Sequence, residues 1–279
     1  MRRIIIFIAL MMSLPALRAA QISDAFYINS KFIKNDFSAV SQVIGRLSTG
    51  VEASYVKHKT FDDPNFMLAV PVVMSYEMIE FMFKPFAMPQ TNNMYAYGAS
   101  FSMLLNMEKN TVDDKFTQAA LSAGYVNQKA YIARESGTLR DDCGQIAYGL
   151  SLRRNFYNAF VFGANGNIYQ YLNGIAGVQA AASIFNQNDF SNLNTYDVVY
   201  GLPKYSAGAT FDRILSKGAN IYLAYSYTEF YTDAPRHSVI LGNDFPVTKS
   251  VKADLGYNHV MTNRGGKKDI FKIALSVSF

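Results

Sequence analysis

The sequence predicts an all-β protein: a transmembrane antiparallel β-barrel of about 12 strands with a short N-terminal helix or extension. Two observations carry this prediction. Apolar and polar residues alternate with a period of two through most of the chain, up to its last residue. The first 20 residues have the layout of an export signal. Alternation of this kind places one set of side chains in lipid and the other in a wet lumen, as in barrels that span membranes.

The N-terminal segment 1–20 predicts a secretory signal peptide. Two arginines precede an apolar run from residue 4 to residue 14, and Pro15 and small residues follow. This run is too short for a transmembrane helix, which needs about 20 residues. We expect cleavage after Ala19 or Ala20, which lowers the formal charge from +5 to about +2 because three arginines and no acid are lost.

The rest of the chain contains no segment suited to a helical membrane span. The most apolar stretch, residues 66–83, contains Glu77 and Glu80, which a helix would place in the middle of the bilayer. Only helices and closed sheets satisfy every backbone polar group in lipid. A membrane location therefore requires a closed barrel.

Residues 21–46 are expected to form an extension ahead of the barrel. Phe37, Val40, Ile44 and Leu47 recur at spacings of three and four, and Asp36 can serve as the N-cap. The pattern predicts a short amphipathic helix over 36–47, in the lumen or at its periplasmic mouth. The alternative is that this segment extends the first strand, since glycine and β-branched residues weaken a helix.

The barrel is expected to occupy residues 47–279, with an even number of strands because both chain ends lie in the periplasm. Two versions fit the pattern. If residues 66–86 form one strand and 187–204 one long outer loop, the count is 12, which we prefer. If 66–86 divides near residues 75–77 and 196–202 adds a strand, the count is 14.

The final strand, residues 270–279, shows the clearest alternation. Its apolar face resembles the C-terminal targeting signal of Gram-negative outer-membrane β-barrel proteins, which the barrel-assembly machinery reads. The resemblance implies an outer-membrane location, contact with outer-membrane lipid, and this machinery as a partner. We expect the strand to close the barrel by pairing with 251–261 and with 47–58, because an unpaired edge is not tolerated in lipid. The assembly face comprises Phe271, Ile273, Leu275, Val277 and Phe279.

Aromatic residues near strand ends predict the girdles that flank the apolar band of such barrels. The candidates are Tyr95, Tyr97, Tyr222, Tyr225, Tyr227, Phe230 and Tyr231.

Charged and amide residues on the opposite face are the candidate lumen lining. Charged rings in a lumen determine which solutes pass. The alternative is that Lys252, Asp254 and Lys272 only pair with one another across neighbouring strands. The predicted lumen-lining residues are Glu52, Gln145, Arg153, Asp212, Lys252, Asp254, Asn258 and Lys272.

Residue patterns for catalysis or cofactor binding are weak. His237 and Ser238, with Asp233 nearby, invite a hydrolase interpretation, but adjacent strand residues point to opposite faces. Glu229 and Asp233 are better explained as a solvated acidic loop than as a cation site. There is no phosphate-binding glycine loop and no metal-ligand spacing, so we expect no cofactor, no metal and no enzymatic activity.

Two further features limit the possible partners. The small basic cluster at residues 264–268 is typical of an exposed loop and does not indicate nucleic acid. Cys143 is the only cysteine, which excludes a disulfide within the chain.

These observations favour a monomeric outer-membrane β-barrel that acts as a passive channel for small polar solutes. The alternative is a solitary barrel that resembles the translocator of autotransporters and serves as a surface antigen or structural protein. An outer-membrane hydrolase is a third hypothesis.

Overall fold

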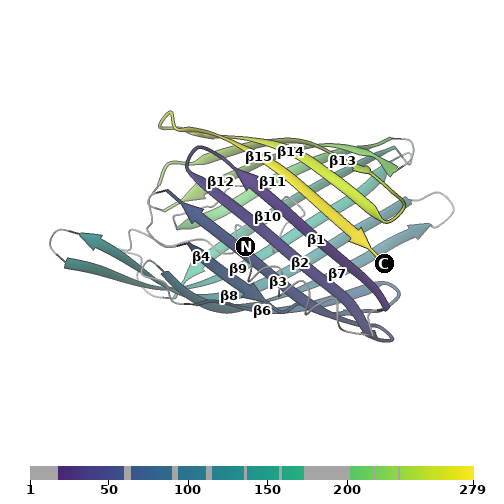
Figure 1. Cartoon of the computed structure of the whole chain (residues 1–279), viewed down its shortest axis with the longest axis horizontal. Helices are drawn as coiled ribbons and strands as arrows, with labels where there is room; N and C mark the ends of the chain where they lie inside the picture. The colour runs from purple at the N-terminus through teal and green to yellow at the C-terminus, as the bar shows by residue number, and fades with distance from the viewer. Residues whose placement is uncertain are drawn as a thin grey trace.

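The fold is a closed antiparallel barrel in a computed structural model (Figure 1). The structure describes residues 18–59, 64–89, 94–110, 115–134, 137–156, 159–172, 202–215, 218–231 and 233–279. The strands are β1 (Arg18–Ile28), β2 (Phe32–Ile44), β3 (Leu47–His58), β4 (Asn65–Ala69), β5 (Val72–Ser75), β6 (Ile79–Met88), β7 (Met94–Asn110), β8 (Lys115–Arg134), β9 (Gly137–Phe156), β10 (Phe160–Tyr171), β11 (Pro203–Ile214), β12 (Asn220–Phe230), β13 (Arg236–Pro246), β14 (Val251–Thr262) and β15 (Lys267–Ser278).

Closure depends on the two ends of the chain. β1 pairs with β15 on one side and with β2 on the other, and β2 pairs with β3. β4 and β5 lie end to end between β3 and β6, separated at Val70 and Pro71, so together they fill one strand position. The 15 strand segments of the sheet therefore form a barrel of 14 strands. Pro71 has no N–H to donate to the ladder, which accounts for the break.

The predicted extension and helix at residues 21–46 are wrong, because this region forms β1 and β2. Lys34 and Asp36 point to the inside of the barrel, while Ile33 and Phe37 occupy the alternate, outward positions. The segment thus has the period of two, and its spacings of three and four are coincidental. β1 begins at Arg18, inside the predicted signal segment, whose residues 1–17 lie outside the described residues.

The prediction for the final strand is half right. β15 pairs with β14 as expected, but its second partner is β1, where Gln21–Ile28 lie opposite Ser278–Phe271, and not residues 47–58. The strand count is 14, the alternative to the preferred 12, and it includes β1 and β2, which were not expected as strands. Residues 66–86 do divide, at a turn over 76–78. Of the strand that the alternative placed at 196–202, residues 196–201 lie outside the described residues.

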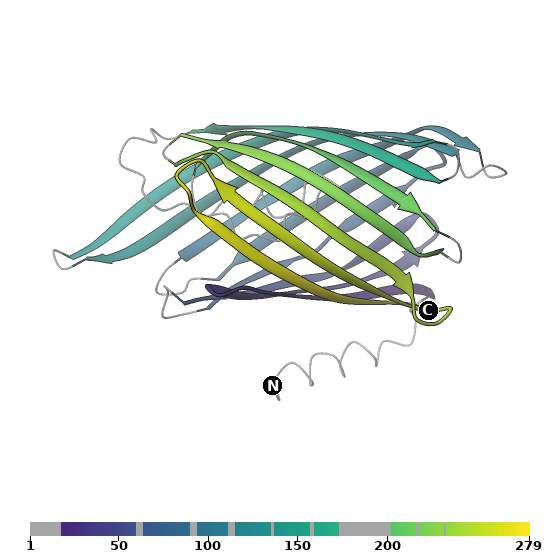
Figure 2. The ribbon, with the colours of Figure 1, turned by 90° about the horizontal axis from the view of Figure 1, so that it is seen from above.

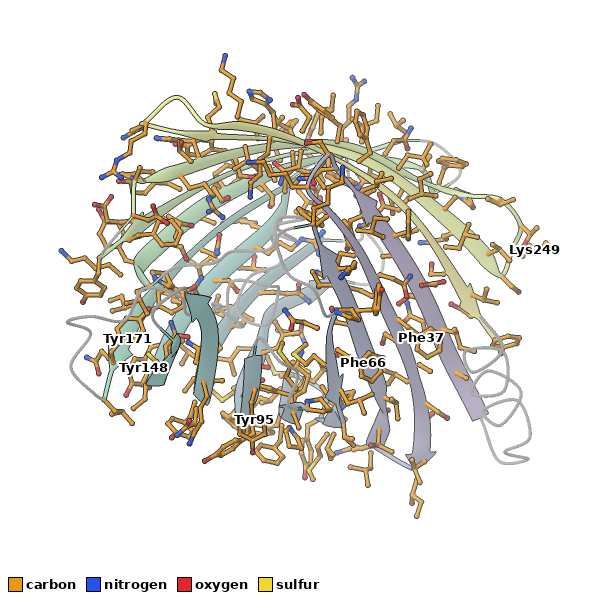
Figure 3. The ribbon with its side chains drawn as sticks, turned by 60° about the vertical axis from the view of Figure 1, so that its left-hand side comes forward. Phe37, Phe66, Tyr95, Tyr148, Tyr171 and Lys249 are labelled. Atoms are coloured by element: carbon orange, nitrogen blue, oxygen red, sulfur yellow. The ribbon has the colours of Figure 1, made fainter. Side chains whose placement is uncertain are left out.

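The outer wall is an apolar band. Four of the five residues of the assembly face on the final strand are exposed, Phe271 at 55%, Ile273 at 59%, Leu275 at 52% and Phe279 at 69%, and Val277 is half-buried. Figure 3 shows further side chains on the outside of the barrel, with Phe66 and Tyr148 among those labelled. Large exposed apolar side chains over a whole sheet face are costly in water and favourable in lipid.

The two ends of the barrel differ. The C-terminus and the start of β1 lie at one end, with short connections such as the β2–β3 turn, where Gly45 has a φ of 52°. β10 ends and β11 begins at the other end, where β8 and β9, each 20 residues long, project beyond the neighbouring strands (Figure 2). Barrels of this class keep their termini and short turns in the periplasm, which orients the molecule. No helix in the described part of the chain is long and apolar enough to cross a bilayer.

Candidate functional site

The inside of the barrel wall carries all eight predicted lumen residues. Side chains of directly paired strand residues share one face, so the register extends the inward face from strand to strand. Lys272 pairs with Gly256 and Tyr27, and Tyr27 pairs with Lys34. The buried members of the predicted set are Gln145, Asp212, Asn258 and Lys272; Glu52, Arg153 and Asp254 are half-buried, and Lys252 is exposed near the periplasmic end of β14.

The first charge cluster joins β12, β14 and β15. Lys272 Nζ lies 2.6 Å from Asp254 Oδ2, and the Tyr222 hydroxyl donates a hydrogen bond of 2.7 Å to Asp254 Oδ1. The Lys272 side chain is only 6% exposed. Burial of a lysine side chain at this depth costs free energy unless an acid compensates it, and Asp254 is that acid.

The second cluster lies on β1, β2 and β3. Lys34 Nζ is 2.6 Å from Asp36 Oδ2, and the Ser54 hydroxyl donates a hydrogen bond of 2.6 Å to the other oxygen of Asp36. The Tyr27 ring connects the two clusters, since Lys34 Nζ lies 4.9 Å and Lys272 Nζ 6.0 Å from its centroid. These distances are in the range of cation–π attraction.

Two more ion pairs continue the series around the wall. Arg153 Nη2 is 3.0 Å from Asp212 Oδ2, between β9 and β11. Lys84 Nζ is 3.2 Å from Glu52 Oε2, between β6 and β3. We call these eight charged residues the inner charged belt: Lys34, Asp36, Glu52, Lys84, Arg153, Asp212, Asp254 and Lys272. Its four cations and four acids balance, so the belt is polar without a net charge.

Amide and hydroxyl groups add neutral polar contacts to the same face. Gln145 Nε2 donates a hydrogen bond of 2.9 Å to the Tyr171 hydroxyl, which in turn donates to the Pro203 carbonyl at 2.8 Å. The Ser238 hydroxyl donates to Asn258 Oδ1 at 2.6 Å. Among the described residues, Asn258 Nδ2 and Gln145 Oε1 have no hydrogen-bond partner. Buried polar atoms of this kind are suited to bind water or a polar solute.

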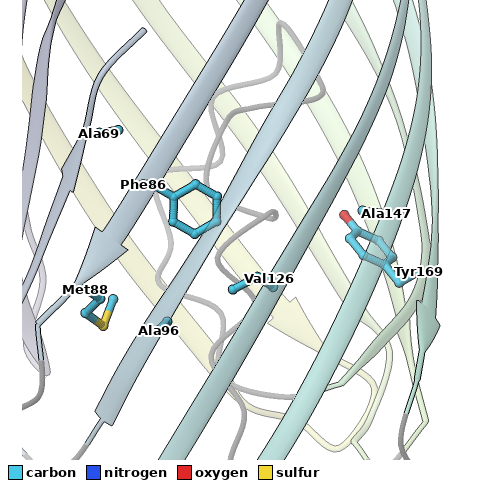
Figure 4. Packing of buried hydrophobic residues seen from close by; sticks show 7 residues of the cluster. All are labelled: Ala69, Phe86, Met88, Ala96, Val126, Ala147 and Tyr169. Atoms are coloured by element: carbon cyan, nitrogen blue, oxygen red, sulfur yellow. The ribbon is translucent and has the colours of Figure 1, made fainter.

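Apolar residues form two clusters on the inward face. Phe86 and Tyr169 lie in one cluster on β4 and β6–β10, with smaller side chains between them (Figure 4). Phe32 and Ile270 belong to a second cluster, on β1–β3 and β12–β15. The inside of the wall is therefore divided into polar and apolar regions.

His237 and Ser238 are not arranged as a hydrolase pair. His237 accepts or donates a hydrogen bond with the outward-facing Tyr225 at 2.8 Å, whereas Ser238 points inward to Asn258. The two neighbours thus lie on opposite faces of the wall, and His237 cannot activate Ser238. His259 is 2.7 Å from Asp269 on the outer surface. No group of three or more potential metal ligands occurs in the described parts of the chain.

Sequence reasoning missed several inward residues and misassigned two girdle candidates. Lys34, Asp36 and Tyr27 fell in the presumed extension, and Lys84 in a stretch that is apolar on both faces. The alternation along β2 was the sequence pattern that could have identified Lys34 and Asp36 as inward residues. Tyr222 and Phe230, expected in the aromatic girdle, point inward instead.

Solved structures resemble the barrel over nearly all of this chain. The CymD monoaromatic hydrocarbon channel aligns with 96% of this chain and 92% of its own, with a TM-score of 0.55 and 8% identity. OccAB1 of Acinetobacter baumannii aligns with 94% and 95%, with a TM-score of 0.52 and 9% identity. CdiB from Acinetobacter baumannii aligns with 95% of this chain and 60% of its own, with a TM-score of 0.50 and 7% identity. No protein-family model and no curated protein matches the chain.

At these identities the likeness establishes the fold. The closed antiparallel sheet, the apolar outer band and these structures together define an outer-membrane β-barrel of the Gram-negative type.

Proposed function

We propose that this barrel is a passive channel through which small polar solutes cross the outer membrane along the inner charged belt. The single observation that carries the proposal is the position of the belt, since paired charges line the inside of a wall whose outside is apolar. A solute that exchanges water for these fixed donors and acceptors loses few hydrogen bonds on its way through. The balanced charge favours neutral or zwitterionic solutes over ions of one sign.

Structural neighbours are consistent with transport. CymD is described as a channel, and the alignment covers most of both chains. Its hydrocarbon solute is not carried over to this chain, because the belt of Lys34, Asp254 and Lys272 favours polar solutes. The solitary translocator-like alternative has less support, since the luminal helix it invoked is strand β2.

The proposal is tested with purified protein refolded into liposomes. We expect swelling in an isotonic solution of a small neutral sugar and discrete conductance steps in a planar bilayer. A matched preparation that was boiled before reconstitution serves as the control. Folded protein that gives neither swelling nor conductance above this control would contradict the channel and leave the barrel fold intact.

A further inference from the structure

We propose that Arg154 and Arg213, on the outside of the barrel, bind the phosphate group of a phospholipid in the periplasmic leaflet. The aromatic rings of Phe156 and Phe160 hold the two guanidinium groups in place. We call these four residues the arginine–phenylalanine patch. The patch faces lipid and shares no residue with the inner charged belt, so this proposal is independent of the channel.

Both arginines occupy outward positions at the periplasmic ends of their strands. On β9 the exposed residues Leu150, Leu152, Arg154 and Phe156 alternate with inward ones, including Arg153. On β11 Arg213 follows the buried Asp212 and is exposed. β9 and β11 both terminate at the rim that holds the C-terminus, which is the periplasmic rim.

The register brings the patch together. Phe160 of β10 is directly opposite Phe156 of β9 and Arg213 of β11. The Arg213 guanidinium carbon lies 5.9 Å from the centroid of the Phe160 ring, and that of Arg154 lies 5.3 Å from the centroid of the Phe156 ring. β9 and β11 are two strand spacings apart, about 10 Å. Two arginine side chains can reach one phosphate group across this distance.

Within the described residues, the charge of the patch is uncompensated. No carboxylate pairs with Arg154 or Arg213 in the described residues, and the nearest acid along the chain, Asp212, points inward to Arg153. An arginine on the lipid side of a barrel is costly at the middle of the bilayer and nearly free at its interface. The guanidinium fork fits phosphate oxygens, and a ring beneath it restricts its orientation.

The same rim repeats this chemistry, and the opposite rim differs. In the turns of the periplasmic rim, the Arg46 guanidinium carbon lies 5.4 Å from the centroid of the Tyr76 ring. Toward the other rim, outward tyrosines contact histidine or acid: Tyr225 bonds to His237, and Tyr257 donates to Asp269 at 2.6 Å. The other rim also has Lys204 Nζ 5.9 Å from the Tyr231 ring, and the inward-facing Arg236 with its guanidinium carbon 5.3 Å from the Phe230 ring. Among the described residues, the stacked arginines outside the lumen therefore lie at the periplasmic rim, where phospholipid phosphates lie.

The test measures retained lipid by native mass spectrometry of the folded full-length protein, extracted from vesicles of phosphatidylglycerol and phosphatidylcholine in equal amounts. The test variant is Arg154→Gln with Arg213→Gln. The control is Lys249→Gln with Arg264→Gln, which removes the same charge from exposed turns away from the patch. Arg213→Gln alone is included as a milder change, and heat-modifiable migration on a gel confirms folding.

We expect the wild-type protein and the control to retain phosphatidylglycerol preferentially. In the test variant this preference should be about thirtyfold weaker, the effect of two basic side chains at a membrane surface. Arg213→Gln should give an intermediate loss. Equal preference in the wild-type protein and the test variant would overturn the proposal. An equal loss in the control would also overturn it, because bulk charge would then explain the binding.

Discussion

Lys272 and Asp254 form an ion pair of 2.6 Å across the last two strands, on the inside of the barrel. The two residues are diagonal neighbours, because Lys272 lies opposite Gly256 in the ladder. Loss of Lys272 leaves the charge of the half-buried Asp254 without a partner, and loss of Asp254 leaves that of the buried Lys272. We therefore expect Lys272→Met to lower the free energy of unfolding by about 3 kcal/mol, as for other buried pairs that lose one partner.

The measurement is urea unfolding of the barrel in lipid vesicles, followed by gel migration. Asp254→Asn added to Lys272→Met should cost less than the sum of the two single changes, because the second change removes the uncompensated charge. Additive costs would show that the two residues are not coupled.

The Tyr222 ring packs over Gly242, and its hydroxyl group reaches Asp254. A Cβ atom at Gly242 would lie 2.2 Å from Tyr222 Cζ, so Gly242→Ala must displace the ring and weaken its hydrogen bond to the carboxylate. We expect a loss of about 1–2 kcal/mol in the same unfolding assay. At Gly166 the nearest atom to such a Cβ is 3.7 Å away, and Gly166→Ala should change stability by less than about 0.5 kcal/mol. Equal effects at the two glycines would contradict this packing.

The inner charged belt should set the ion preference of the channel. Lys34→Gln with Lys272→Gln removes two of its four cations and should shift the reversal potential in a potassium chloride gradient toward cation selectivity. Asp212→Asn with Asp254→Asn should shift it toward anion selectivity. Shifts in the same direction for both variants would rule out the belt as the selectivity determinant.

Closure through β1 predicts the effect of an N-terminal deletion. Removal of residues 18–28 leaves β2 and β15 with unpaired edges in lipid, so this variant should lose heat-modifiable migration. Removal of residues 1–17 leaves every described strand pair in place and should preserve it. A barrel that still folds without residues 18–28 would contradict the observed closure.

The sequence was sufficient for the barrel and for most of its inner wall, because a period of two determines which face each residue takes. The alternation from Phe271 to Phe279 and the inward positions of Asp254 and Lys272 follow from it directly. The pairing between strands that are distant in the chain does not follow from this period. The partners of Lys84 and Arg153 depend on the register, and the role of residues 18–44 was obscured by apolar spacings that fit a helix and a strand equally well.

The most direct test of the channel is modification of single cysteines in a Cys143→Ala background. Ser276 points to the lumen, opposite Lys252 and Ser23, and its neighbour Leu275 is 52% exposed on the lipid face. A negatively charged, membrane-impermeant methanethiosulfonate reagent should lower the single-channel conductance of Ser276→Cys and leave that of Leu275→Cys unchanged. The absence of any conductance in the unmodified variants, or an equal response at the two positions, would contradict passage of solutes through the barrel.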